Sequence, residues 1–212
     1  MSLPTQNTHS DHSNLMAARE LTLIVAATNK MGIGLAGTLP WIGLKKELSY
    51  FARVTKRAGP GTINAVVMGR KTWESIPPRF RPLKDRLNVV ISSGSTDAEF
   101  TISNMETALD FLGSKLVQRK AFVIGGGQMY KASLEHKEAK RILLTRVLGD
   151  FECDTFFPIE LNEDGTADGW LRKSKQELDE WVGETVPEGI QEENETKYVF
   201  EMWERTDSAE AI

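Results

Sequence analysis

Five short, nearly continuous apolar runs recur along the chain, and they constrain its fold more than any other feature. Runs of this kind are typical of strands that are buried on both faces of a parallel sheet. They lie at 21–28 (LTLIVAAT), 63–69 (INAVVMG), 86–92 (RLNVVIS), 120–127 (KAFVIGGG) and 141–148 (RILLTRVL). The sequence therefore predicts a buried, mostly parallel sheet.

Helical patterns fill most of the segments between these runs. We expect helices over about residues 42–57, 70–76, 104–113 and 128–136. Asn104 is a suitable amino-terminal cap for the third helix, and Gly113 is a suitable end. Strands that alternate with helices predict an α/β domain.

The carboxy-terminal part of the chain has a different pattern. The segment 197–204 (KYVFEMWE) alternates apolar and polar side chains, as an antiparallel or edge strand does. The acidic stretch between Pro158 and this strand is expected to form loops. No internal repeat or linker divides the chain, so we expect a single domain whose sheet ends in an antiparallel C-terminal strand.

Charge and composition exclude several classes of function. The 212 residues carry a formal net charge of -4, which does not favour general nucleic-acid binding. No apolar run reaches the roughly 18 residues that indicate a membrane span. The single cysteine, Cys153, cannot form an internal disulfide and fits a reducing compartment. The three histidines do not cluster with it, so no metal site is expected.

Residues 1–19 are polar and lack periodicity, so they are predicted to form a flexible N-terminal tail. The tail contains neither the apolar stretch of a secretory signal nor the basic residues of a transit peptide. We therefore expect a cytoplasmic protein.

The segment 123–130 (VIGGGQMY) places three glycines between a strand and a helix. Free backbone amides at such a helix start can hold a phosphate group. The dinucleotide fingerprint G-x-G-x-x-G fails because Tyr130 stands at its sixth position. A tight strand-to-helix turn without a ligand remains the alternative interpretation.

A second strand-to-helix junction, 68–73 (MGRKTW), offers two cations and a hydroxyl in Arg70, Lys71 and Thr72. The P-loop pattern is absent, because Asn64 occupies the place of its first glycine. Taken alone, the segment could be a solvated basic turn. Two such junctions in one sheet suit a dinucleotide, and a 2′-phosphate would require the extra cation.

Glu47 lies within an apolar seam, because Leu44, Leu48 and Phe51 recur on the same face of the predicted helix. With Trp41 these side chains would line a pocket for a flat ring system. Burial should raise the pKa of the carboxyl group, which could pair with an amidine-like edge through two hydrogen bonds. The alternative is a carboxylate at the margin of the seam that reaches water.

Two further polar groups could complete such a site. Thr145 lies in an apolar strand, where a buried hydroxyl needs a partner, and Glu47 would be a suitable one. The segment 81–86 (RPLKDR) carries cations that are ordinary at a surface. Near a pocket, one of its arginines could bind a substrate carboxylate through two hydrogen bonds.

Nine segments together resemble dihydrofolate reductase in their order and spacing: IVAATNKMGIG, LPW, ELSYF, MGRKTW, IP, RPLKDR, VIGGGQMY, LTRV and DFECDTFFP. The resemblance runs from about Leu21 to Arg205, and the long segment before the last strand is similar to the eukaryotic, fungal form. It implies a reductase domain over residues 20–206, followed by a short tail at 207–212. It also implies a central, mostly parallel sheet of about eight strands with an antiparallel C-terminal strand, flanked by about four helices.

The resemblance assigns roles to the residues of the pteridine site. Glu47 would hold the pteridine ring, Trp41 would order a water molecule beside it, and Thr145 would hydrogen-bond the carboxylate. Arg86 would bind the carboxylate of the glutamate tail. The remaining substrate contacts implied are Ile24, Val25, Leu44, Leu48, Phe51, Ile76, Leu83, Ile124 and Tyr130.

The resemblance also implies NADPH as the cofactor. The implied contacts are Ala26, Ile33, Gly34, Gly37, Thr38, Gly69, Arg70, Lys71, Thr72, Ser92, Ser93, Gly125, Gly126, Gly127, Gln128 and Met129. In the family the peptide between Gly125 and Gly126 is cis. Ser93 departs from an arginine that many members use for the 2′-phosphate, although Arg70 can still supply charge there. Thr38 replaces an acidic residue that often precedes LPW.

The expected reaction is the reduction of 7,8-dihydrofolate to tetrahydrofolate, with hydride transfer to pteridine C6 and protonation at N5. The segment from Lys30 to Thr38 would close over the nicotinamide. The resemblance further implies a monomer that binds antifolate inhibitors. Two alternatives stay open: a pyrimidine reductase of similar fold in riboflavin synthesis, and a folate-binding protein without activity.

Overall fold

The computed structural model describes residues 20–114 and 118–206. The predicted tails at 1–19 and 207–212 lie outside the described residues. The strands are β1 (Leu21–Thr28), β2 (Gly32–Gly34), β3 (Ile63–Gly69), β4 (Arg86–Ile91), β5 (Phe100–Ile102), β6 (Gln118–Val123), β7 (Ala139–Leu148), β8 (Thr155–Phe156), β9 (Thr166–Ala167), β10 (Trp170–Arg172), β11 (Gln191–Glu193) and β12 (Thr196–Arg205). The helices are α2 (Lys45–Lys56), α3 (Arg70–Ser75), α4 (Met105–Gly113), α5 (Gly127–Leu134) and α6 (Lys175–Val182), with a 3₁₀ turn at Pro78–Phe80.

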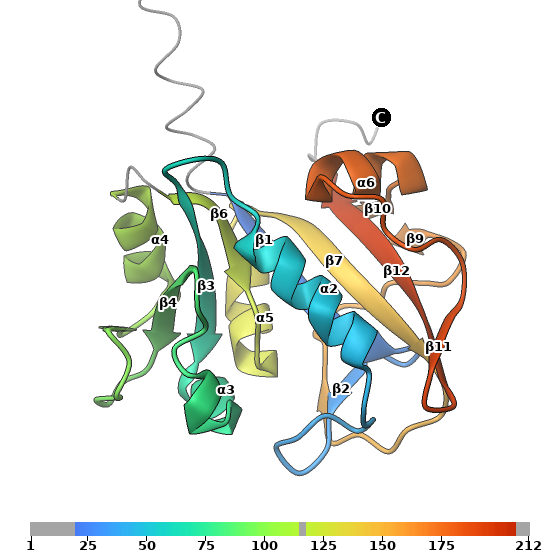
Figure 1. The fold of residues 1–212 in the computed structure, drawn as a ribbon, viewed down its shortest axis with the longest axis horizontal. Coiled ribbons are helices and arrows are strands. Elements are labelled where there is room, and N and C mark those ends of the chain that lie inside the picture. Colours follow the sequence, from blue (N-terminus) through green and yellow to red (C-terminus); the bar gives the residue numbers. More distant parts are fainter. Residues whose placement is uncertain (1–19, 115–117, 207–212) are drawn as a thin grey trace, which may run out of the picture.

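The main sheet has the order β5-β4-β3-β6-β1-β7-β12-β10-β9, and β11 pairs with β12 at residues 196–198 (Figure 1). All pairs from β5 to β7 are parallel, and those that involve β12 and β10 are antiparallel. The predicted α/β domain with a mostly parallel sheet and an antiparallel C-terminal strand is therefore confirmed. The apolar runs at 21–28 and 63–69 form β1 and β3 with the predicted bounds.

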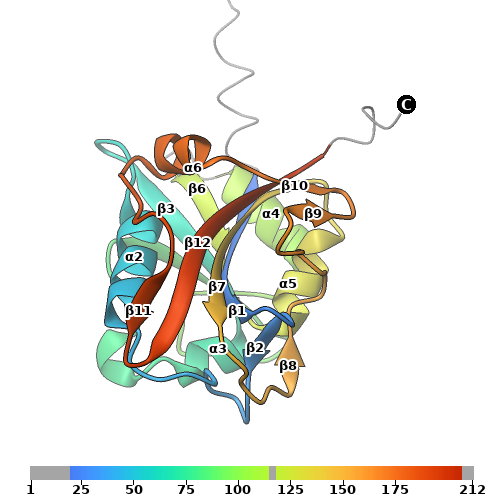
Figure 2. The same cartoon turned by 90° about the vertical axis from the view of Figure 1, so that its right-hand side faces the viewer.

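Helices cover both faces of the sheet. Alternate residues of each buried strand point to opposite sides, so each face packs against its own set of helices. In β1, Leu23 and Val25 pack with α4 and α5, whereas Ile24 packs with α2, α3 and α6. Figure 2 shows α2 on one side of the sheet and α4 and α5 on the other. This two-sided burial explains why the strands are apolar without alternation.

Helix α2 begins at Lys45, three residues later than the sequence predicted. Gly43 has a φ of +78°, and Leu44 has a ψ of 72°, so the chain is not helical before Lys45. Asn104 caps α4 as expected, since its side chain accepts a hydrogen bond from the Thr107 amide at 2.9 Å.

The prediction of loops after Pro158 was wrong. This region contains α6 and the strands β9, β10 and β11, so the described residues form a ten-stranded sheet and a two-stranded one rather than about eight strands. They form five α-helices rather than about four. Strands of two or three residues are too short to show a period, but α6 carried a readable signal in its capping box of Ser174 and Glu177. No helix in the described ranges is long and apolar enough to cross a membrane.

Candidate active site

Glu47 is buried in the first turn of α2, with 8 % of its surface exposed. Thr145 of β7 donates a hydrogen bond from Oγ1 to Oε1 of Glu47 at 3.0 Å. Burial raises the pKa of Glu47 to about 7; the hydrogen bond from Thr145 opposes this rise, and the negative charge of Glu193 adds to it. The expected burial, partner and pKa shift of Glu47 are all confirmed, so this side chain can hold a proton near neutral pH.

The apolar residues around Glu47 are not all buried. Trp41 and Leu44 pack in one cluster with Val147 and Tyr198. Phe51 is half-buried, but Leu48 is 54 % exposed, so the expectation that Leu48 lies within a buried seam was wrong. Leu48 is exposed because its part of α2 faces outward, where no other described element covers it. An exposed leucine beside a buried carboxylate leaves an apolar surface available to a ligand.

The other predicted substrate residues divide between the two faces of the sheet. Ile24, Ile76, Leu83 and Ile124 belong to the cluster on the α2 side, the same side as Glu47. Val25 and Tyr130 pack in the cluster on the α4–α5 side. The Tyr130 hydroxyl nevertheless donates a hydrogen bond to the Ile24 carbonyl of β1 at 2.8 Å. Burial raises the pKa of Tyr130, and the charge of Glu47 adds to the rise.

Arg86 lies at the start of β4 and is buried, with its guanidinium held in a fixed plane. Its Nη1 donates to Thr55 Oγ1 at 2.9 Å, and its Nε donates to the Lys84 carbonyl at 3.1 Å. Burial lowers its pKa, while the neighbouring Asp85 raises it. A guanidinium that is already oriented by two hydrogen bonds is suited to bind a carboxylate.

The two glycine-rich junctions touch each other. The Gly69 amide donates to the Gly125 carbonyl at 2.9 Å, which joins the end of β3 to the start of α5. The Gly125–Gly126 peptide is cis, as the resemblance implied. A Cβ atom at Gly69 would lie 3.1 Å from Met129, and one at Gly127 would lie 3.3 Å from Thr155. Glycine at these positions therefore lets the junction pack closely against Met129 and Thr155.

The remaining predicted cofactor contacts lie at the carboxyl ends of neighbouring strands. Arg70 and Lys71 are exposed at the start of α3, and Thr72 is half-buried. Ser92 and Ser93 follow β4, and Ala26 lies in β1. The segment from Ile33 to Thr38, with Gly34 and Gly37, follows β1; its Ala36 amide donates to Asp154 Oδ2 at 2.8 Å. Gln128 is exposed in the first turn of α5. The structure thus gathers these residues at one edge of the sheet.

The structure adds three supporting residues that the sequence analysis missed. Thr55 orients Arg86, and the Asn88 side chain exchanges hydrogen bonds with the Leu83 backbone at 2.9 Å in both directions. Glu193 binds the amino-terminal end of α2. A buried polar residue within an apolar strand was a readable signal for Asn88, whereas Glu193 lies in an acidic stretch without any distinguishing pattern.

The described residues contain no group of three or more His, Cys, Asp or Glu side chains that could hold a metal ion. The candidate site therefore consists of the Glu47 carboxyl group, the Arg86 guanidinium and the two glycine-rich junctions.

The raised pKa of Glu47 predicts how the stability of the ligand-free protein varies with pH. The folded protein keeps the Glu47 proton up to about pH 7, whereas the unfolded chain loses it near the ordinary value of 4.5. The folded state then binds more protons between these values, so the free energy of unfolding should fall by up to about 3 kcal/mol as the pH rises through this range. Urea denaturation at several pH values, compared with Glu47→Gln, measures the effect. Equal pH dependence in both proteins would contradict the prediction.

An α/β sheet whose glycine junctions meet at its carboxyl edge, next to a buried carboxylate, has the layout of doubly wound enzymes that bind nucleotides. Comparison with known proteins narrows this class. The family described as dihydrofolate reductase matches residues 20–205. The dihydrofolate reductase of Pneumocystis carinii is 41% identical over 201 residues, which cover 88% of this chain and 97% of the relative.

Animal relatives are similar to the same extent. The dihydrofolate reductase of Gallus gallus is 39% identical over 196 residues, which cover 89% of this chain and 97% of the relative. The solved structure of Schistosoma mansoni dihydrofolate reductase has a TM-score of 0.72 at 34% identity and covers 88% of this chain and 98% of that chain. The chain belongs to the dihydrofolate reductase family.

Proposed function

We propose that Glu47 is the residue that binds and orients the pteridine ring of dihydrofolate during its reduction to tetrahydrofolate. The chain is an oxidoreductase of the dihydrofolate reductase family, and that reduction is its reaction. The observation that carries the proposed role is the buried Glu47 carboxyl group, held by Thr145 at 3.0 Å. A buried carboxyl group needs a hydrogen-bonding partner, and the N–C–NH₂ edge of a pteridine offers two donors.

We assign Glu47 to ring orientation rather than to direct proton transfer to N5. A carboxyl group with a pKa of about 7 is poised to share a proton with the bound heterocycle near neutral pH. By binding the ring edge it favours the protonated form of the substrate, and a water molecule carries the proton to N5. Trp41, buried beside it, is assigned to hold that water.

NADPH is proposed as the cofactor, because the family uses it and the glycine junction fits it. Gly69 and Gly127 let the two junctions pack closely, because a Cβ there would crowd Met129 and Thr155. The amides at the start of α5 would hold a phosphate group, and Arg70 and Lys71 would supply cations. When bound, NADPH supplies the hydride for C6. The segment from Lys30 to Thr38 would exclude water from the site.

Several finer features belong to the same proposal. We propose a monomer in the cytoplasm that binds antifolate inhibitors, with one reductase domain over residues 20–206 between a flexible N-terminal tail and a short C-terminal tail. We also propose the fungal form. The relative from Cryptococcus neoformans is 40% identical, and that from Gallus gallus is 39% identical.

The family match does not favour the two alternative functions. One spectroscopic assay tests all three: NADPH absorbance is followed with dihydrofolate, with the pyrimidine substrate of riboflavin synthesis, or with neither. Loss of absorbance with dihydrofolate alone is the expected result. A protein that binds dihydrofolate without consuming NADPH would be a binding protein, and the proposal would fail.

Replacing Arg86 with leucine should raise the Michaelis constant for dihydrofolate about tenfold to a hundredfold, with a smaller effect on the turnover number. The reason is the loss of a charge-assisted pair with the carboxylate of the substrate's glutamate tail. Initial rates at several substrate concentrations measure the effect. Truncated pteridines without the glutamate tail are the control, because their kinetics should not distinguish the variant from the parent. An unchanged Michaelis constant would remove Arg86 from the site.

A further inference from the structure

Helix α2, which carries Glu47, does not receive its amino-terminal cap from its own segment. The residue at the cap position, Leu44, has no side-chain acceptor, so the first amides of the helix need a partner from elsewhere. Glu193 of β11 provides it from a distance of 147 residues along the sequence. Its Oε1 and Oε2 accept from the Lys46 amide at 3.0 Å and 2.9 Å, and Oε1 also accepts from the Glu47 amide at 3.3 Å.

The Glu193 carboxylate is itself held in place. Tyr198 of β12, which pairs with Gln191 across the β11–β12 hairpin, donates its hydroxyl hydrogen bond to Glu193 Oε1 at 2.6 Å. The Tyr198 ring is buried in the cluster that contains Trp41 and Leu44. Asn194, at the turn of the hairpin, donates to the Gly43 carbonyl at 2.7 Å. The hairpin therefore binds the chain just before α2 and the first amides of the helix.

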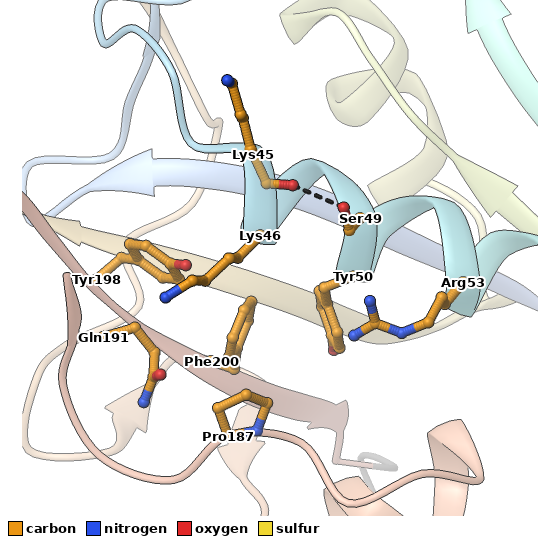
Figure 3. Close-up of a pocket in the computed structure, with 9 residues that line it drawn as sticks. All are labelled: Lys45, Lys46, Ser49, Tyr50, Arg53, Pro187, Gln191, Tyr198 and Phe200. Carbon is orange, nitrogen blue, oxygen red and sulfur yellow. Dashed lines mark hydrogen bonds between the residues drawn. The ribbon is translucent and has the colours of Figure 1, made fainter. Parts of the chain in front are cut away.

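A pocket of about 330 Å³ lies between α2 and this part of the chain (Figure 3). Beside it, the Tyr50 ring of α2 packs on Phe200 of β12, with ring centroids 4.2 Å apart. Lys46 and Tyr198 lie at one end of this pocket, and Arg53 lies at the other. Arg53 and Arg57 are paired with Glu184, which precedes the hairpin. Polar contacts at both ends, together with the packing of Tyr50 on Phe200, thus set the position of α2 relative to the hairpin.

We propose that Glu193 is a positioning residue for the enzyme: by capping the first turn of α2 it fixes where the Glu47 carboxyl group meets Thr145 and the substrate. The inference rests on the role proposed above for Glu47. Glu193 also places a negative charge beside the carboxyl group that it positions, and this charge contributes to the raised pKa of Glu47. Burial opposes ionisation of Glu193, but the hydrogen bonds from Tyr198 and the two α2 amides prevail, and the pKa of Glu193 is lowered.

Several charged or titratable groups bear on Glu47 besides Glu193, and each comes from an element packed around it. They are Tyr50 on α2, Tyr130 on α5 and Tyr198 on β12, whereas the charge of Lys46 on α2 acts on Glu193. Burial raises the pKa of all three tyrosines, and the charge of Glu47 adds to each rise. The tyrosines therefore stay neutral near pH 7, and Glu193 is the negative charge among these groups that a substitution can remove.

The test uses Glu193→Ala, which removes both cap and charge, and Glu193→Gln, which removes the charge and keeps one acceptor. Glu192→Gln is the matched control, because Glu192 is exposed on the other face of β11 and carries the same charge. Carbon-13 NMR of the side-chain carboxyl groups follows the Glu47 titration, with Glu47→Gln identifying its resonance. Amide hydrogen exchange follows the backbone of Lys46 and Glu47.

Exchange of these two amides should be at least about tenfold faster in Glu193→Ala than in the parent, with a smaller increase in Glu193→Gln. In both variants the Glu47 titration should move to lower pH, and the falling limb of the turnover–pH profile should move with it. Glu192→Gln should change neither. A lower melting temperature with an unshifted Glu47 titration and unchanged exchange would overturn the inference. The amide exchange and the Glu47 titration need no substrate, so failure of the role proposed for Glu47 would appear separately, as an active Glu47→Ala enzyme.

Discussion

Replacing Glu47 with alanine is expected to lower the turnover number about a hundredfold to a thousandfold near neutral pH. The substitution removes the buried carboxyl group that accepts the hydrogen bond of Thr145. It also leaves the Thr145 hydroxyl without its acceptor. Steady-state rates with dihydrofolate and NADPH measure the loss. Near-normal turnover would remove the central role assigned to Glu47.

The affinity for NADPH is the internal control for this variant. The glycine junctions at Gly69 and Gly125–Gly127 lie at the end of β3 and the start of α5, whereas Glu47 lies on α2, so the cofactor should bind with little change. Quenching of tryptophan fluorescence by NADPH measures the dissociation constant. A large loss of NADPH affinity would show that the substitution disturbs the fold rather than the chemistry.

Replacing Arg146 with leucine is expected to lower the free energy of unfolding by about 3 to 5 kcal/mol. Arg146 of β7 is 2 % exposed and makes two parallel hydrogen bonds to Glu201 of β12, at 2.8 Å and 2.9 Å. Its Nη2 also donates to the Leu161 carbonyl at 2.9 Å. The substitution would leave the buried Glu201 carboxylate without its close counter-charge, since Arg172 lies 3.9 Å away. Urea denaturation measures the change.

Two further variants separate loss of the pair from loss of packing. The double variant Arg146→Leu, Glu201→Leu should recover a large part of the lost stability, because two apolar side chains leave no buried charge behind. Asp150→Asn, which breaks the exposed Lys30–Asp150 pair, should change the stability little. If Arg146→Leu behaves like Asp150→Asn, the buried pair does not support the sheet as described.

The elements that the sequence predicted correctly carry their signal in consecutive residues. The runs that became β1 and β3 are apolar because both faces of the sheet are covered, and this burial is visible in composition alone. Glu47 and Thr145 were recognisable for a related reason: each is a polar residue within an apolar pattern, which demands a partner. The glycine-rich junctions were recognisable because the free backbone amides at such a helix start can hold a phosphate group.

The elements that were missed depend on partners far away in the sequence. The strands β10 and β11 pair with β12, and β9 pairs with β10; all three are too short to form without these partners, and no local pattern predicted them. The exposure of Leu48 follows from how α2 sits on the sheet, and its helical spacing could not reveal this. The first turn of α2 likewise has no capping residue of its own.

The sequence by itself determined the five buried strands with the helices between them, the family, and the burial of Glu47 and Thr145, because these depend on hydrophobic pattern and on motifs read along the chain. Only the tertiary structure decided which groups meet: the contact of Gly69 with Gly125, the orientation of Arg86 by Thr55, and the cap that Glu193 places on α2. The physical reason is that hydrogen bonds and charge interactions act over a few ångströms in space, whatever the separation of their partners in sequence.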